Sequence, residues 1–161
     1  MAINDEDLGY LRRCVELARS ALDAGDEPFG SLLVDADGDI RFEDRNQVKD
    51  GDETRHPEFA IARWATTNLS PAERLRATVY TSGEHCPMCS AAHAWVGLGR
   101  IVYAASSEQL VSWLREWQAP LSPVAALPIP TVAPGIAVDG PAPELTDAMK
   151  SLYEAKFRPA R

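Results

Sequence analysis

Two short motifs contain residue types that bind metal ions and transfer protons. His56 stands two residues before Glu58, and Cys86 stands three residues before Cys89. Zinc in proteins binds cysteine thiolates and neutral histidine, and a Cys2His set with an open fourth position is a catalytic arrangement. We therefore expect the imidazole and both thiols to hold one zinc ion. Glu58 is the expected catalytic residue, because a carboxylate beside the ion can carry protons.

Proline follows one ligand in each motif, at Pro57 and at Pro87. Proline is favoured at the first position of a helix, where its missing N–H is not needed. The pattern therefore predicts that His56 and Cys86 each stand immediately before a helix. Helix N-termini have partial positive charge, which favours thiolate over thiol. Cys89 would follow one turn later on the same face, so that two helix starts could share one ion.

The same residues allow other interpretations. The two cysteines could be a buried pair of small side chains or a redox dithiol, and His56 could be a helix-capping residue. His93 stands four residues after Cys89, on the same face of the expected helix. A closed site with His93 as the fourth ligand would be a structural zinc module without catalysis.

Hydrophobic periodicity predicts the elements that must position these side chains. Helices are predicted for residues 6–24, 57–68, 87–98, 107–117 and 144–157. Strands are predicted for residues 32–34, 40–43, 77–81 and 101–105, the first two as a hairpin. A connection is expected near residues 70–73, a turn at 82–83, and an extended or irregular course over the Pro-rich stretch 120–143. This order predicts an α/β fold with three layers, a mixed β-sheet flanked by helices.

Length and composition predict one soluble domain. The chain has 161 residues, 45% of them hydrophobic, which is enough for one well-filled core. We expect a single domain over residues 1–161, with the zinc-site core at about 28–105 and a C-terminal Pro-rich segment and helix at 119–158. No apolar stretch approaches the roughly 18 residues that a membrane span needs. Together with the acidic N-terminus, this predicts a cytoplasmic protein without membrane contact.

The charge distribution argues against a nucleic-acid partner. The formal net charge is −8, and no run of Lys or Arg is present. Phosphate backbones would repel such a chain unless a basic patch were concentrated somewhere. Three cysteines do not make a disulfide framework, and their Cys-x-x-Cys pair points to metal or redox chemistry. Trp113 and Trp117, four residues apart, are expected to form a core stripe.

The motifs resemble those of the cytidine-deaminase superfamily, in particular its guanine deaminase and tRNA adenosine deaminase branch. The matching residues span about residues 28–95 in the family order. They are Pro28-Phe29-Gly30, Asn46, Asp52-x-Thr54-x-His56-x-Glu58 and Tyr80-Thr81-Ser82-x-Glu84-x-Cys86-Pro87-Met88-Cys89.

The resemblance implies the cytidine deaminase-like fold, one Zn2+ per chain on the ligand set above, and Glu58 as the proton shuttle. It also implies three substrate-binding residues: Asn46 as a hydrogen-bonding anchor for the ring, Phe29 at the pocket wall and Trp95 as a pocket-lining aromatic. Family members are commonly dimers, so we expect a homodimer. Tyr153 and Phe157 could cover a neighbouring subunit's pocket, although packing within the C-terminal helix is the favoured interpretation.

Three departures from the family pattern leave the substrate open. Pro57 replaces an alanine whose backbone N–H binds a ring carbonyl, and proline has no N–H. Gly83 and His85 replace a cysteine and a proline. Beyond residue 105 the chain follows no assigned pattern. The expected reaction is hydrolytic deamination of a small ring that contains an N=C–NH2 group. The ring could be guanine-like, cytosine-like or an amino-triazine. The alternative functions are tRNA adenosine deamination and the structural zinc module.

Overall fold

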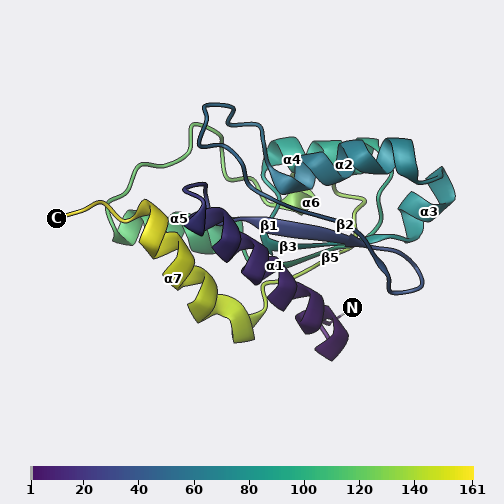
Figure 1. Cartoon of the computed structure of the whole chain (residues 1–161), viewed down its shortest axis with the longest axis horizontal. Coiled ribbons are helices and arrows are strands. Elements are labelled where there is room, and N and C mark those ends of the chain that lie inside the picture. The colour runs from purple at the N-terminus through teal and green to yellow at the C-terminus, as the bar shows by residue number, and fades with distance from the viewer. Residues whose placement is uncertain (1) are drawn as a thin grey trace.

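A mixed sheet lies at the centre of the computed structural model, which describes residues 2–161 (Figure 1). Its strands are β1 Gly30–Val34, β2 Ile40–Arg45, β3 Thr78–Gly83, β4 Ile101–Ala105 and β5 Val138–Asp139. The order across the sheet is β2-β1-β3-β4-β5. β1 runs antiparallel to both β2 and β3, whereas β3, β4 and β5 are parallel. The predicted hairpin and the predicted strand at residues 101–105 are thereby confirmed.

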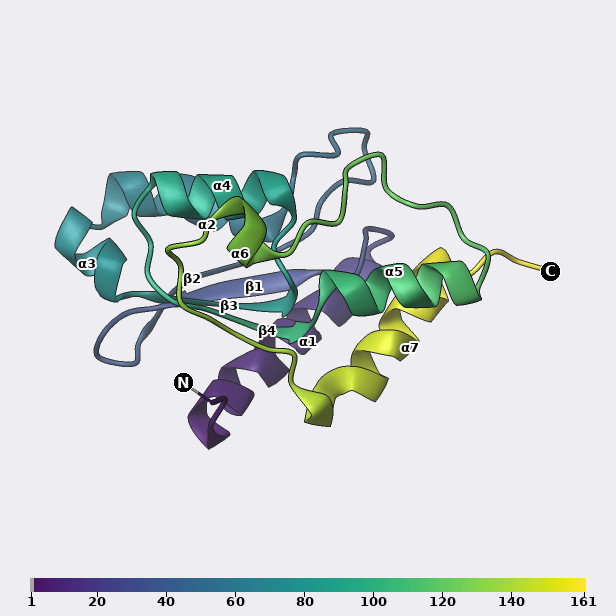
Figure 2. The ribbon, with the colours of Figure 1, turned by 180° about the vertical axis from the view of Figure 1, so that it is seen from behind.

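Helices cover both faces of this sheet, so the predicted three-layer α/β architecture is confirmed (Figures 1 and 2). One face carries α1 Asp5–Asp23, α5 Ser107–Glu116 and α7 Thr146–Phe157, the last preceded by the 3-10 turn Pro143–Leu145. The other side carries α2 Pro57–Asn68, α3 Pro71–Arg76, α4 Pro87–Trp95 and α6 Ile129–Val132. Among residues 2–161 no helix is long and apolar enough to cross a membrane.

Two apolar clusters fill the spaces between the layers. Leu32 and Val34 of β1 point into the cluster under α1, α5 and α7, and Leu33 points into the cluster under α2 and α4. This alternation follows from the two-residue period of a strand. Trp113 and Trp117 are buried in the first cluster, which confirms the predicted core stripe.

Where the observed elements differ from the predicted ones, tertiary partners explain the difference. β3 continues through Gly83, where a turn was expected, because Gly83 pairs with Ala105 of the parallel strand β4. α4 ends at Trp95 rather than near residue 98, just before Gly97 with φ +73°. The expected connection after Ser70 is the capped helix α3. The Pro-rich stretch contains α6 and β5, and β5 forms because β4 offers it a free edge.

Gly30, at the start of β1, lets α1 lie directly on the sheet. A Cβ atom at this position would lie 2.4 Å from the Cβ of Leu17 and 2.6 Å from the carbonyl oxygen of Cys14. Both atoms belong to α1, and the second is backbone that cannot rotate away. The next residue, Ser31, faces the candidate site, so the position of α1 and the geometry of that site depend on the same strand.

We therefore expect Gly30→Ala to destabilise the protein by about 1–3 kcal/mol, because α1 must move away from β1. The matched control is Gly9→Ala, also on α1, where a Cβ meets nothing within 4 Å. That change should stabilise by about 0.5–1 kcal/mol, since alanine is the better helix former. Urea unfolding of both variants measures the two changes in the free energy of unfolding, which should have opposite signs. A Gly30→Ala variant as stable as the parent would show that α1 does not lie this close to β1.

Candidate metal centre and active site

The N-termini of α2 and α4 bring the predicted metal ligands together. His56 is the N-cap residue of α2 and Cys86 is the N-cap residue of α4, each with extended backbone and each followed by proline. Neither side chain caps its own helix, so both are available to a ligand. Cys89 follows in the first turn of α4. The expectation that two helix starts meet at one point is confirmed.

The distances among the three ligand atoms fit a zinc ion. His56 Nδ1 lies 3.5 Å from Cys86 Sγ and 3.6 Å from Cys89 Sγ, and all three atoms lie within 4.8 Å of one another. Tetrahedral zinc with bonds of about 2.3 Å to sulfur and about 2.0 Å to nitrogen separates N and S ligands by about 3.5 Å. The side-chain positions and the donor types therefore both suit this metal.

The protonation of the two cysteines is coupled. The hydrogen bond with Cys89, and then that with His56, lower the pKa of Cys86 to about 4 against the effect of burial. The same bond to Cys86, and then burial, raise the pKa of Cys89. The pair is thus held as one thiolate beside one thiol, and a divalent ion that binds both sulfurs displaces the remaining proton.

Glu58 lies beside this cluster without joining its ligand set. It is the second residue of α2, and its side chain is buried. Oε1 accepts hydrogen bonds from Ser31 Oγ at 2.9 Å and from Thr81 Oγ1 at 2.8 Å. Oε2 lies 3.8 Å from Cys89 Sγ. Burial raises the pKa of Glu58, which brings the carboxylate closer to the range of a proton carrier at neutral pH.

Ser31 is a site residue that the motifs did not indicate. It is the one polar side chain within the apolar strand β1, and it is fully buried. A buried hydroxyl in the middle of a strand needs a hydrogen-bond partner. That rule was the available signal, but it could not say that the partner would be Glu58.

His93 does not belong to the ligand cluster. Its Nε2 lies 2.7 Å from the carbonyl oxygen of Gly99, and the imidazole is buried. Its ring packs edge-on against His85 with centroids 5.4 Å apart. Among residues 2–161 the metal-binding group consists of His56, Cys86 and Cys89 alone. The closed structural site therefore lacks the fourth ligand that was considered for it.

Asn46 is buried where the β2 strand leaves the sheet. Its Oδ1 accepts from the backbone N–H groups of Glu27 at 3.3 Å and Val48 at 3.2 Å. Its own backbone N–H donates to the carbonyl of Phe29. These contacts fix which end of the amide faces the backbone, and they leave Nδ2 as the group that can meet a ligand.

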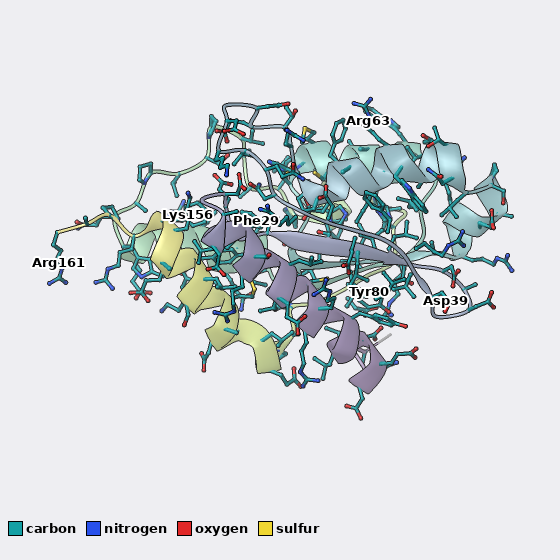
Figure 3. The ribbon with its side chains drawn as sticks, in the orientation of Figure 1. Phe29, Asp39, Arg63, Tyr80, Lys156 and Arg161 are labelled. Carbon is teal, nitrogen blue, oxygen red and sulfur yellow. The ribbon has the colours of Figure 1, made fainter. Side chains whose placement is uncertain are left out.

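Phe29 lies against the C-terminal helix, near the end of α7 that carries Lys156 (Figure 3). Its ring centroid is 5.5 Å from that of Tyr153 and 6.5 Å from that of Phe157. A Cβ on Gly83 would lie 2.7 Å from the Tyr153 hydroxyl. The helix α7 thus packs over the end of β3 within the same chain, as the favoured interpretation of Tyr153 and Phe157 predicted.

Trp95 is placed differently from the other expected pocket residues. Its side chain is 87% exposed, on the last residue of α4. It lines a surface groove of about 350 Å³ together with Phe59 and Ala62 of α2. Phe59 also lines the cavity that contains His56. Within one chain, Trp95 therefore borders a groove next to the site and does not line the site itself.

Residues 4–105 match the family described as the cytidine and deoxycytidylate deaminase zinc-binding region. The match covers more than half of the chain and includes the three ligand residues and Glu58. The chain belongs to this family, and the resemblance inferred from the motifs is confirmed.

Known proteins similar to this chain include deaminases of different bases. It is 36% identical over 109 residues to a probable cytosine deaminase of Schizosaccharomyces pombe, covering 68% of this chain and 66% of that protein. It is 38% identical over 98 residues to the guanine deaminase of Bacillus subtilis, covering 60% of this chain and 62% of that protein. The chain thus spans slightly less than two thirds of each relative.

The fold extends beyond these matched segments. A solved structure of guanine deaminase from Nitrosomonas europaea superposes with a TM-score of 0.72 over 95% of this chain and 84% of that one. The sequences are 23% identical, so this likeness shows the shared fold. The C-terminal part that lies outside the family match is therefore also part of a deaminase-like architecture.

Acid should destabilise the metal-free protein through His93. Burial lowers the pKa of His93 to about 4, against 6.5 when exposed, so below pH 6.5 the unfolded chain binds a proton that the folded chain does not. Its contribution to stability is complete above pH 6.5 and is lost as the pH falls toward 4, by about 3 kcal/mol at most. Urea unfolding in chelator at several pH values measures this slope.

The control is His93→Gln, which keeps an N–H donor for the carbonyl of Gly99 but does not titrate. The slope of the free energy of unfolding against pH gives the number of protons taken up on unfolding. Between pH 6.5 and 5 this number should be lower in the variant by roughly one. Superimposable slopes for the parent and the variant would contradict the burial of a neutral imidazole.

Proposed function

We propose that this protein is a zinc-dependent hydrolytic deaminase that releases ammonia from a free nucleobase or a related amino-heterocycle. The observation that supports this proposal is the cluster of three candidate ligands, His56, Cys86 and Cys89. The buried carboxylate of Glu58 lies beside this cluster and is not part of it. Three protein ligands leave a tetrahedral ion one position for water or substrate, as catalytic sites require.

Each chemical task then falls to a named group. The chemistry that a bound zinc ion supplies is Lewis acidity, which makes water a nucleophile at neutral pH. Glu58 takes a proton from the attacking water and gives it to the ring nitrogen next to the carbon that bears the amine. Glu58 then takes the second proton from the new C–OH group and gives it to the amine, which leaves as ammonia while a ring carbonyl forms. The substrate must therefore contain an N=C–NH2 group.

Asn46 supplies a donor for the ring. Because its Oδ1 is occupied by two backbone N–H groups, its Nδ2 faces an acceptor such as a ring nitrogen or carbonyl oxygen. Pro57 has no N–H, so it offers no second donor at the start of α2. Phe29, which packs against Tyr153 of α7, provides an apolar wall.

The charge of the chain favours a small substrate over RNA. The formal net charge is −8, and Glu27, whose pKa is raised by burial and by Glu53, lies within electrostatic reach of His56. Acidic groups near the site oppose a phosphate backbone. Guanine-like bases, cytosine-like bases and amino-triazines are neutral and meet no such repulsion. A tRNA substrate is the alternative that a binding test must address.

Replacing Glu58 tests the proposed chemistry directly. Glu58→Gln keeps the shape and can still accept from Ser31 and Thr81, but it cannot carry a proton. We expect zinc content and melting temperature to stay near the parent values and ammonia release to fall by at least about 100-fold. The measurement is ammonia release by zinc-loaded protein from a panel of guanine, cytosine and amino-triazines.

The same panel decides between the proposed functions. Ammonia release from one of these rings by the parent, abolished in Glu58→Gln, supports the deaminase. Absence of turnover on every ring would contradict free-base deamination. If the protein instead bound tRNA with a steep salt dependence and released ammonia from it, the tRNA alternative would replace the proposal.

We also propose that the protein is a homodimer in which the groove beside Trp95 is covered by a second copy. An indole that is 87% exposed beside an apolar groove is typical of a contact surface. The groove shares Phe59 with the cavity at His56, so the contact would adjoin the site.

Light scattering during size-exclusion chromatography tests this surface. Trp95→Glu should convert the dimer to monomer, because a carboxylate would be buried in the contact. Leu75→Glu, on the exposed face of α3, is the matched control and should leave the dimer intact, since Leu75 is 69% exposed and lies outside the groove. A parent protein that is monomeric at micromolar concentration would refute the proposal.

A further inference from the structure

Two buried hydroxyls on neighbouring strands converge on one oxygen of Glu58. Ser31 of β1 and Thr81 of β3 are direct cross-strand partners, and both are fully buried. Their oxygens lie 2.8 Å apart, and both lie within 2.9 Å of Glu58 Oε1. The central strands of the sheet thus hold a carboxylate that comes from the first turn of α2.

The two oxygens of Glu58 have different surroundings. Oε1 is enclosed by the two hydroxyls, and hydrogen bonds to an ionised acceptor are stronger than neutral ones. Oε2 lies on the side of the metal ligands, 3.8 Å from Cys89 Sγ. Held at Oε1, the carboxylate presents Oε2 toward the candidate metal ligands, where it has the long contact with the Cys89 thiol.

Neither hydroxyl depends on Glu58 to satisfy its own hydrogen-bonding capacity. Ser31 can donate to Thr81 Oγ1 at 2.8 Å, and Thr81 can donate to the carbonyl oxygen of Gly83 at 2.9 Å. A buried hydroxyl pair needs no more than this. Because each hydroxyl has a single proton, it donates either to these neighbours or to Oε1, and the ionised carboxylate is the stronger acceptor.

We infer that Ser31 and Thr81 are positioning residues of the proposed deaminase, which hold Oε1 so that Glu58 carries the proton on Oε2. The expected effect on turnover rests on the proposed function. The expected effect on the position of Glu58 rests on the hydrogen bonds alone. Preorganised groups lower a barrier because they need no rearrangement during the reaction. Loss of either hydroxyl then lowers turnover while substrate binding is unchanged.

Thr81→Val tests this with little change of shape, since it replaces the hydroxyl by a methyl group. We expect kcat to fall about 10- to 100-fold, the value of a hydrogen bond to a charged group, with KM within about twofold of the parent. Thr81→Ser restores a hydroxyl at the same atom and should recover most of the lost turnover. Ser31→Ala should resemble Thr81→Val, which gives a second variant if the first folds poorly.

The Glu58→Gln background separates positioning from general damage. If the hydroxyls act through the proton carrier, Thr81→Val should cause no further loss in the residual activity of Glu58→Gln. An equal loss in both backgrounds, a rise in KM without a fall in kcat, or a loss of zinc from Thr81→Val would overturn the inference.

Crystal structures of zinc-loaded Thr81→Val and Thr81→Ser provide a readout that does not use turnover. Glu58 should leave its observed position in the valine variant and keep it in the serine variant. An unmoved Glu58 in the double change Ser31→Ala with Thr81→Val would refute the inference. If the parent releases no ammonia from any ring, the proposed function fails, whereas this structural comparison still decides whether the hydroxyls position the carboxylate.

Discussion

The approach of two helix N-termini is the constraint on which the rest of the structure depends. His56 and Cys86 can share an ion only because α2 and α4 begin side by side over the same face of the sheet. Each helix start contributes partial positive charge to a group of sulfur and carboxylate acceptors that would otherwise be costly to bury. The layered fold supplies this meeting point, since both helices pack on the apolar residues of β1 and β3.

The two halves of the site differ in burial. Cys89 is buried whereas His56 and Cys86 are half-buried, and the three candidate ligand atoms already lie at separations that suit zinc. Glu58 is buried, which raises its pKa and so favours the protonated form. The hydroxyls of Ser31 and Thr81 oppose that tendency, because they stabilise negative charge on Oε1. A carboxylate balanced in this way is suited to accept and release a proton within one reaction.

The meeting of the three candidate ligands could be predicted from the sequence because each one stands in a local motif. A proline after His56 and after Cys86 predicts a helix start, and both helices are observed there. The contacts of Ser31 and Tyr153 could not be found in this way. The contact of Ser31 with Glu58 depends on the register of β1 against β3, and the position of Tyr153 depends on how a distant helix packs. The exposure of Trp95 likewise follows from the point at which α4 ends.

The division between local and distant residues also follows the boundary of the family match. The ligands and Glu58 lie within the family match over residues 4–105, whereas Tyr153 on α7 lies beyond it. Gly83 connects the two parts: it occupies the end of β3, and its missing side chain admits the Tyr153 hydroxyl. A side chain there would displace the Tyr153 hydroxyl, so the end of β3 and the packing of α7 depend on each other.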